Sequence, residues 1–242
     1  PTFREAWRIG CCGTLLAVHW VLFYGSIKAA NVSVGVVCFA LNGFFTALLE
    51  PMASGKRFSL RDLLLGLITL GGIVLIFGLN MQFRTGIVIG TFSSLFYTLF
   101  AIASKRVQSA TGVESSAMLL YELLTGWCVL SLAMPFYAML YPSVSLMPEG
   151  SDWLFITLFA SVFTIGPFLT QLQALRTLSA FTVNLSYNLE PLYSIALAML
   201  LFNEAQELNL SFWMGVSMIV AAVGYHAVCG KRSVFVKPDE QR

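Results

Sequence analysis

Charged residues are scarce in this sequence. Asp, Glu, Lys and Arg together make up 11% of its 242 residues, whereas a soluble domain carries about 25%. Hydrophobic residues reach 57%, and the mean hydropathy is +0.79. A chain with so few charges is not expected to fold as a water-soluble domain or to have a nucleic-acid partner.

The patterns that indicate metal, redox or nucleotide chemistry are missing as well. The five cysteines lie in apolar segments and lack the paired spacing of a zinc or redox site; they are Cys11, Cys12, Cys38, Cys128 and Cys229. The sequence contains no phosphate-binding glycine loop, metal-ligand cluster or nucleophile elbow in a supporting context. We therefore expect no cofactor, no metal site and no enzymatic activity.

The chain instead contains long apolar runs. At least eight stretches of 17 to 25 residues are almost free of charge, at 9–27, 32–53, 63–79, 86–104, 117–141, 153–175, 180–202 and 210–229. A helix rises about 1.5 Å per residue and needs roughly 20 residues to cross about 30 Å of hydrocarbon. Barrel strands would alternate apolar and polar residues instead. The sequence predicts an all-α fold, a polytopic membrane helix bundle with eight transmembrane helices.

The basic residues are distributed unevenly between the loops. With the N-terminus in the cytoplasm, twelve of the 14 Lys and Arg residues fall on the cytoplasmic side, and only Lys28 and Arg84 fall outside. Basic residues in short loops favour the cytoplasmic side. We therefore expect an integral protein of the bacterial cytoplasmic (inner) membrane, with both ends of this chain in the cytoplasm.

The chain resembles itself at an offset of 148 residues. Lys28 aligns with Arg176 and Phe39 with Tyr187, and in both copies a basic turn separates two long spans. Five spans lie between the two turns, so the copies cross the membrane in opposite directions. Inverted repeats are typical of secondary transporters, in which the solute site lies near the midplane at the repeat interface.

Two segments resemble the EamA-like family of the drug/metabolite transporter superfamily. The similar stretches are Ala17 to Tyr24, Lys28 to Ser33, Leu63 to Gly72, Ala101 to Arg106, Ala174 to Arg176, Asn188 to Tyr193 and Asn203-Glu204. The chain departs from the family pattern at Gly43 and at Gly55-Lys56.

The resemblance implies ten helices in two inverted five-helix repeats, of which this chain lacks the first two helices. It divides the chain into a partial first repeat of three helices at 1–80, a second repeat of five helices at 86–230 and a cytoplasmic tail at 231–242.

Glu190 lies at the centre of the span predicted for 180–202. On a helix it shares a stripe about 140° wide with the polar residues Thr182, Ser186, Tyr187, Tyr193 and Ser194. Pro191 follows at once and frees the carbonyl of Tyr187. An acid in the middle of a membrane helix needs a partner or a cavity. The stripe could bind a cationic or hydroxylated solute or exchange a proton, or Glu190 could serve helix packing through hydrogen bonds.

Other polar residues inside the apolar spans are further candidates. Asn42 occupies the position that the repeat relates to Glu190, His19 lies in the middle of the first span, and Gln171 lies near the inner end of its span. Such side chains also bridge membrane helices by hydrogen bonds, so a packing role stays open for each. The predicted solute-binding residues are Glu190, Tyr187, Tyr193, Ser186, Asn42, His19 and Gln171.

Two further acids and a glycine pair are expected to be structural. Glu122 lies close enough to the cytoplasmic end of its span that we expect it to be partly solvated, and we expect Glu50 to extend towards the interface. Gly86 and Gly90 are spaced for close packing of helices within one bundle.

Together these features predict a secondary-active transporter. We expect export of a small metabolite or drug-like solute by alternating access, with protons as the coupling ion and Glu190 as the proton-coupling group. The expected partners are that solute and the lipid bilayer, and the protein is expected to be a monomer or a homodimer. A nucleotide-sugar-type carrier, a non-transporting membrane protein and a lipid-modifying membrane enzyme remain alternatives.

Overall fold

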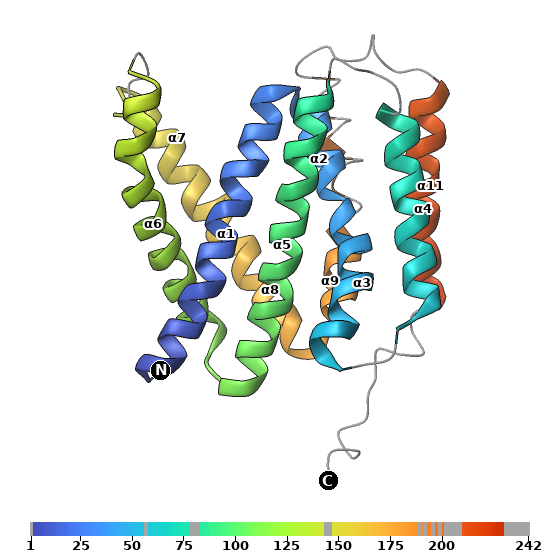
Figure 1. The fold of residues 1–242 in the computed structure, drawn as a ribbon, viewed down its shortest axis with the longest axis horizontal. Coiled ribbons are helices and arrows are strands. Elements are labelled where there is room, and N and C mark those ends of the chain that lie inside the picture. The colour runs from blue at the N-terminus through green and yellow to red at the C-terminus, as the bar shows by residue number, and fades with distance from the viewer. Residues whose placement is uncertain are drawn as a thin grey trace. The chain divides into compact units, whose positions relative to one another are not determined.

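In the part of the chain that the computed structural model describes, all regular secondary structure is helical. That part comprises residues 2–55, 58–77, 83–142, 147–187 and 210–229, with residues 190, 193, 194, 197 and 200. The helices are α1 (Phe3–Ala29), α2 (Val32–Phe39), α3 (Leu41–Ser54), α4 (Leu60–Phe77), α5 (Arg84–Thr111), α6 (Ser115–Leu140), α7 (Asp152–Leu158), the π-helix η2 (Phe159–Ile165), α8 (Gly166–Thr177), α9 (Ala180–Ser186) and α11 (Leu210–Cys229) (Figure 1).

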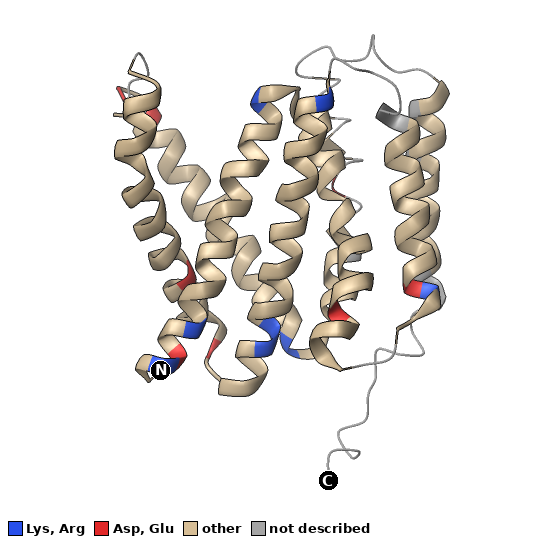
Figure 2. Ribbon diagram, viewed as in Figure 1, with Lys and Arg blue, Asp and Glu red and all other residues tan. Residues whose placement is uncertain are grey.

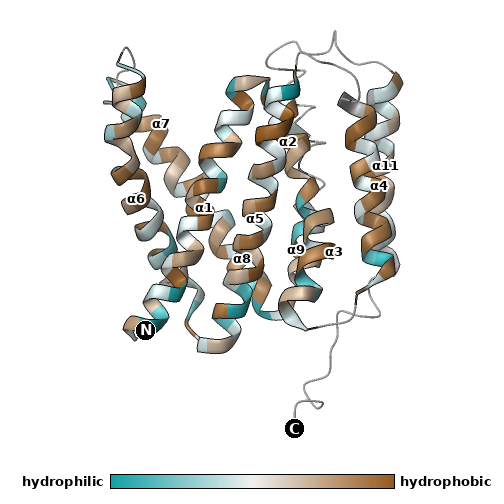
Figure 3. Ribbon diagram, viewed as in Figure 1, coloured by the Kyte–Doolittle hydropathy of each residue, from teal (hydrophilic) through white to brown (hydrophobic). Residues whose placement is uncertain are grey.

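Each predicted span contains a helix, and no strand occurs among the described residues. Five segments are long and apolar enough to cross a membrane: Phe3–Ala29, Val32–Ser54, Arg84–Thr111, Ser115–Leu140 and Asp152–Thr177. Apolar residues run along the helices in Figure 3. The prediction of an all-α membrane helix bundle is confirmed. Most of 188–209, with Pro191, and the predicted tail at 231–242 lie outside the described residues.

Two of the predicted spans are not continuous α-helices. The span at 32–53 is interrupted at Ala40, which separates α2 from α3. The Ala40 N–H donates to the Val37 carbonyl at 3.0 Å. The span at 153–175 contains the π-helix η2, where the Thr164 hydroxyl donates to the carbonyl of Phe159 at 3.2 Å. Such irregular turns in membrane helices are frequent near functional sites.

The helices form two compact units. The first unit consists of residues 1–17 and 103–177, and the second consists of residues 18–102 and 178–242. Helices α1 and α5 contribute to both, since the borders between the units fall inside them. The division into a three-helix and a five-helix repeat stays a prediction.

Close approach of backbones organises the second unit. A Cβ on Gly86 would overlap Ala30, and a Cβ on Gly90 would lie 2.7 Å from Cβ of Cys38. This confirms the predicted packing role of the glycine pair within one bundle. Elsewhere in this unit α4 packs on α11, where a Cβ on Gly72 would lie 2.7 Å from the Gly215 carbonyl.

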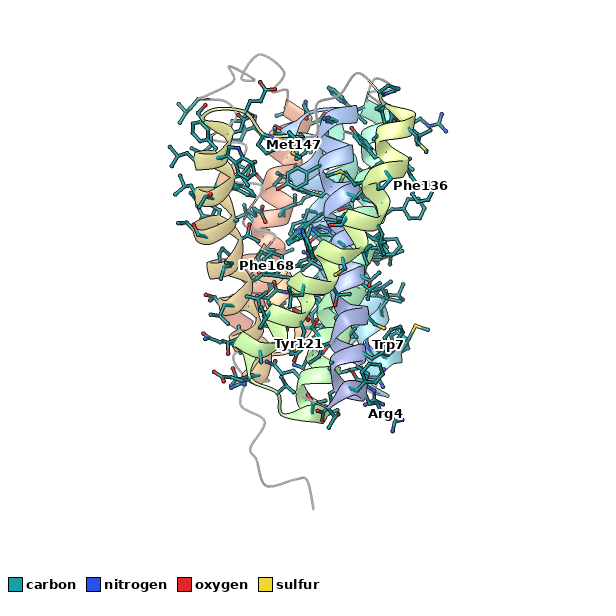
Figure 4. The ribbon with its side chains drawn as sticks, turned by 90° about the vertical axis from the view of Figure 1, so that its left-hand side faces the viewer. Arg4, Trp7, Tyr121, Phe136, Met147 and Phe168 are labelled. Atoms are coloured by element: carbon teal, nitrogen blue, oxygen red, sulfur yellow. The ribbon has the colours of Figure 1, made fainter. Side chains whose placement is uncertain are left out.

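The first unit is built in the same way. A Cβ on Gly13 of α1 would overlap the backbone of Glu122 on α6. Large apolar side chains of these helices also point outwards, among them Trp7 and Phe136 (Figure 4), which are 69% and 70% exposed. Apolar side chains on the outside are expected where lipid replaces water as the solvent.

Basic residues lie near helix ends (Figure 2). In the second unit, Lys28 at the end of α1 and Arg84 at the start of α5 share one end of an antiparallel pair, because the Ser26 hydroxyl donates to the Gly86 carbonyl at 2.7 Å. These are the two basic residues that the charge distribution assigns to the outer side. Their common position agrees with that assignment.

Candidate functional site

Helices α3 and α9 of the second unit run antiparallel and contact each other along their length. The Phe181 N–H donates to Oε2 of Glu50 at 2.9 Å, and the Asn184 side-chain amide donates to the Thr46 hydroxyl at 2.8 Å. Further along, the rings of Phe39 and Tyr187 are 6.0 Å apart. As the residue number rises on α9, the number of its partner falls, which establishes the antiparallel direction.

This contact agrees with the predicted inverted repeat. Phe39 and Tyr187 are related by the offset of 148 residues and contact each other, as residues on a two-fold axis do. The same offset relates Asn31 to Ser179, and both cap a helix: the Asn31 side chain accepts from the Val34 N–H at 2.8 Å, and the Ser179 hydroxyl accepts from the Thr182 N–H at 3.0 Å.

Rings gather where α2 meets the end of α9. Phe39 lies 4.6 Å from Tyr97 and 5.4 Å from His19, and Tyr97 lies 5.9 Å from Tyr187, all between ring centroids. Helix α5 holds the imidazole in place, because Nδ1 of His19 lies 2.9 Å from the Ser93 hydroxyl and 3.0 Å from its carbonyl. The cluster is a buried aromatic wall with one imidazole and two phenol groups.

Hydroxyl groups cover the break between α2 and α3. The Ser94 hydroxyl of α5 donates to the Phe39 carbonyl at 2.9 Å, and the hydroxyls of Thr98 and Thr46 donate to the Asn42 carbonyl at 3.3 and 2.6 Å. Backbone carbonyls in a bilayer need such partners, since no water is present to replace a missing helical bond.

Two carboxamides beside this break have atoms without a hydrogen-bond partner among the described residues. Asn42 is fully buried, and neither its Nδ2 nor its Oδ1 has a partner among the described residues. Asn184 is also fully buried, and its Oδ1 likewise finds no partner in the described part of the chain. A buried amide group without a hydrogen-bond partner lowers stability by about 1–3 kcal/mol. The unpaired atoms of Asn42 and Asn184 therefore require an explanation, such as a bound ligand.

We call this region the amide–aromatic site and define it by Asn42, Thr46, Asn184, His19, Tyr97 and Tyr187. It offers one amide donor, two amide acceptors, hydroxyl groups and ring faces. Glu190 lies one turn beyond Tyr187 and is partly buried. Such a set can hold a flat or hydroxylated solute by stacking and hydrogen bonds, with a carboxyl group at its edge.

The structure brings together some of the predicted residues. Asn42, His19 and Tyr187 belong to the amide–aromatic site. Tyr193 is 67% exposed, and Ser186 is exposed with its hydroxyl donating to the Thr182 carbonyl at 2.9 Å. Gln171 is buried in the first unit.

Sequence reasoning missed Asn184, Tyr97 and the hydroxyls of α5. Ser94 and Thr98 are four residues apart and therefore lie on one face of an apolar helix. That pair of hydroxyls was a readable signal of a polar contact. Asn184 lies only six residues before Glu190, yet its register on the helix carried no comparable signal.

Two expectations about acids were wrong. Glu50 was expected to extend towards the interface but is 7% exposed, because its side chain turns to α9 and accepts the Phe181 N–H. Glu122 was expected to be partly solvated but has no exposed surface, because α1 and α5 close over it.

Comparison with known proteins places the chain in a family. Residues 84–225 match the EamA-like transporter family. Sixteen chains of solved structures are similar; one of them, titled "Crystal structure of protein", is 18% identical with a TM-score of 0.67, over 93% of this chain and 78% of that chain. No curated protein matches the sequence. The solved structure supports the fold, and the family match covers more than half of the chain, so this protein belongs to the EamA-like transporter family of integral membrane proteins.

Proposed function

We propose that this chain is a secondary-active transporter that exports a small metabolite or drug-like solute by alternating access. One observation supports this most strongly: beside a wall of rings, the second unit buries the whole carboxamide of Asn42 and the Oδ1 of Asn184 without hydrogen-bond partners among the described residues. A protein that needed these amides only for packing would pair them, because an unsatisfied amide destabilises the fold. In a member of a transporter family, a solute is the natural partner.

The chemistry of the amide–aromatic site favours a solute without phosphate groups. Its polar groups are amides, hydroxyls and one imidazole, with the carboxyl group of Glu190 nearby. A nucleotide-sugar-type carrier would need Lys or Arg to meet the diphosphate, and the residues that define the site include neither. A neutral hydroxylated compound or an organic cation fits better.

Alternating access would work through the contact of α3 with α9. Helix α9 is joined to α3 at Glu50 and Thr46, and Tyr187 just after α9 contacts Phe39 of α2, the helix that the predicted repeat relates to α9. Rocking of one against the other would open the amide–aromatic site to each side of the membrane in turn. In this proposal Glu190 exchanges a proton with each turnover and thereby couples export to the proton gradient.

The proposed location is the bacterial cytoplasmic membrane, with both ends of this chain inside. The basic residues support this location. Cys12 of α1 interacts with Ser104 of α5, so Arg8, one turn before Cys12, and Lys105, next to Ser104, lie at the same end of the first unit. A basic cluster at one end of the helices favours the cytoplasmic face.

Uptake into proteoliposomes tests the function. The full chain is reconstituted with an acidic lumen, and three probes are added outside: ethidium as an organic cation, uridine as a neutral hydroxylated ring and UDP-glucose as a nucleotide sugar. We expect accumulation of ethidium or uridine that depends on the pH gradient, and no accumulation of UDP-glucose. Transport of UDP-glucose alone would favour the nucleotide-sugar carrier, and no transport of any probe would count against the proposal.

The variant Glu190→Gln tests proton coupling. We expect it to abolish gradient-driven accumulation while membrane insertion stays intact. The matched control is Glu149→Gln, which removes an exposed carboxyl group from a loop and should leave uptake unchanged. Unchanged uptake in Glu190→Gln would show that Glu190 does not couple transport to protons.

A further inference from the structure

The first unit contains a buried carboxyl group that the proposed transport cycle does not yet use. Glu122 of α6 has no exposed surface. Its Oε1 accepts a hydrogen bond from the Ser104 hydroxyl of α5 at 2.7 Å, and its Oε2 has no partner among the described residues. The side chain therefore has one satisfied and one unsatisfied oxygen inside a membrane-spanning helix.

Backbone contact with α1 encloses this carboxyl group. A Cβ on Gly13 would overlap the backbone of Glu122, and a Cβ on Gly126 would lie 3.5 Å from the Gly13 carbonyl oxygen. One turn away on α1, a Cβ on Gly10 would lie 3.0 Å from the Thr125 hydroxyl. Because glycine allows this approach, water has no path to Glu122 between α1 and α6 while the two helices are in contact.

Among the described residues, the groups that face Glu122 include no cation that is bonded to it. Helix α1 presents the Cys12 thiol, which interacts with both Glu122 and Ser104, and which donates to the Arg8 carbonyl at 3.5 Å. Helix α5 presents Ser104. Helix α8 also packs on α6, and the guanidinium of its Arg176 donates to the Val113 carbonyl at 3.3 Å. Within the described chain, Ser104 is thus the one hydrogen-bond partner of the carboxyl group.

We propose that Glu122 is a second proton-binding site, distinct from Glu190. In the closed arrangement it holds a proton on the oxygen that lacks a partner, while the other oxygen accepts from Ser104. When α6 separates from α1 and α5, water reaches the carboxyl group, and the proton passes from Oε2 to a water molecule. The movement rests on the proposed transport cycle, but the protonation of the closed form does not.

Desolvation favours the neutral acid at this position. A carboxylate at this position would lose its hydration and gain a single hydroxyl group in return, whereas a neutral acid loses far less. A permanently structural acid would use both oxygens, as buried polar groups generally do. The unsatisfied oxygen and the closure by glycine rather than by side chains favour a group that is uncovered and covered again.

Infrared spectroscopy of the full chain in lipid tests this proposal directly. A protonated carboxyl group has a C=O stretching band above the amide I band, and that band shifts in D₂O. We expect the difference spectrum of the wild type minus Glu122→Gln to show this band at neutral pH and to lose it as the pH is raised. Glu50→Gln is the matched control, because it replaces another buried acid and should leave the Glu122 band in place.

A second variant covers the case in which Glu122→Gln does not fold. Ser104→Ala keeps the carboxyl group but removes the donor to Oε1, so the same band should move to higher frequency. Carboxylate bands at neutral pH, or a protonated band that persists at every pH at which the helices remain folded, would overturn the proposal.

The experiment separates this inference from the proposed function, since it needs no solute. If the protonated Glu122 band is absent or does not titrate while ethidium or uridine is still transported, the proposal of a second proton site is wrong and the proposed transport function is supported. If the band titrates as expected but no probe is transported, Glu122 binds a proton in a protein whose function lies elsewhere.

Discussion

The two units each bury a glutamate, and the two acids are satisfied in different ways. In the second unit, Glu50 accepts the backbone N–H of Phe181 and fixes the start of α9 against α3. In the first unit, Glu122 accepts a single hydroxyl and leaves one oxygen without a partner in the described structure. A backbone donor cannot move away unless its helix moves, so the hydrogen bond of Glu50 fixes α9 against α3. A hydroxyl can rotate away without any movement of its helix, so the hydrogen bond to Glu122 does not prevent this acid from gaining or losing a proton.

The glycines around Glu122 test how strongly that site depends on backbone contact. Gly13→Ala should lower the free energy of unfolding by about 3 kcal/mol, because the new methyl group overlaps the backbone of Glu122 and forces the helices apart. The control Gly10→Ala meets the end of a threonine side chain at 3.0 Å, so its effect should be well under half as large. Thermal unfolding in detergent measures both. Equal effects would show that α1 and α6 are not in close contact.

Removal of Glu50 tests whether its hydrogen bond fixes α9 against α3. Glu50→Ala should destabilise the second unit by about 2 kcal/mol, because the N–H of Phe181 then loses its hydrogen bond to Glu50 in a buried position. Glu50→Gln keeps an acceptor oxygen and should cost about half as much. Denaturant unfolding followed by circular dichroism gives the two values. Identical stability of Glu50→Ala and the wild type would remove the contrast with Glu122.

Replacement of Asn42 tests whether the unpaired amide serves the solute. Asn42→Leu should leave stability unchanged or raise it by about 1 kcal/mol, because a buried amide without partners is removed. The same variant should lose uptake of the probe that the wild type accumulates. Thermal unfolding and proteoliposome uptake are measured on one preparation. A clear loss of stability would mean that the amide is paired and structural.

The smallest effect is expected at Ser104. If Glu122 is a neutral acid, Ser104→Ala removes one neutral hydrogen bond and should cost about 0.5–1 kcal/mol. If Glu122 were a carboxylate, the same variant would remove its single donor and should cost about 2–3 kcal/mol. Denaturant unfolding at neutral pH separates the two values and therefore decides the charge of Glu122 independently of spectroscopy.

The spans were predictable from the sequence because the bilayer imposes a simple rule. Apolar runs of sufficient length must form helices, since no water can satisfy an open backbone. The ends of α6 and α11 therefore fall close to the predicted limits. The interruption at Ala40 was not predictable in this way, because it depends on hydroxyls of α5 that meet the carbonyls of Phe39 and Asn42.

The candidate site was predictable in part. Asn42, His19 and Tyr187 drew attention as polar or repeat-related residues inside apolar spans, and they do lie in one unit. Asn184 and Tyr97 did not, because nothing in the order of residues states which face of α9 or α5 meets α3. The offset of 148 residues paired Phe39 with Tyr187, and the contact between their rings agrees with that pairing.

The sequence by itself determined that this chain is a bundle of membrane helices and predicted a basic cytoplasmic side, since hydrophobic length and charge position act locally along the chain. The tertiary structure alone decided the state of its acids. Glu50 and Glu122 have the same side chain and are both buried, and the donor that another helix brings to each one distinguishes an acid that fixes α9 against α3 from one that we propose exchanges a proton.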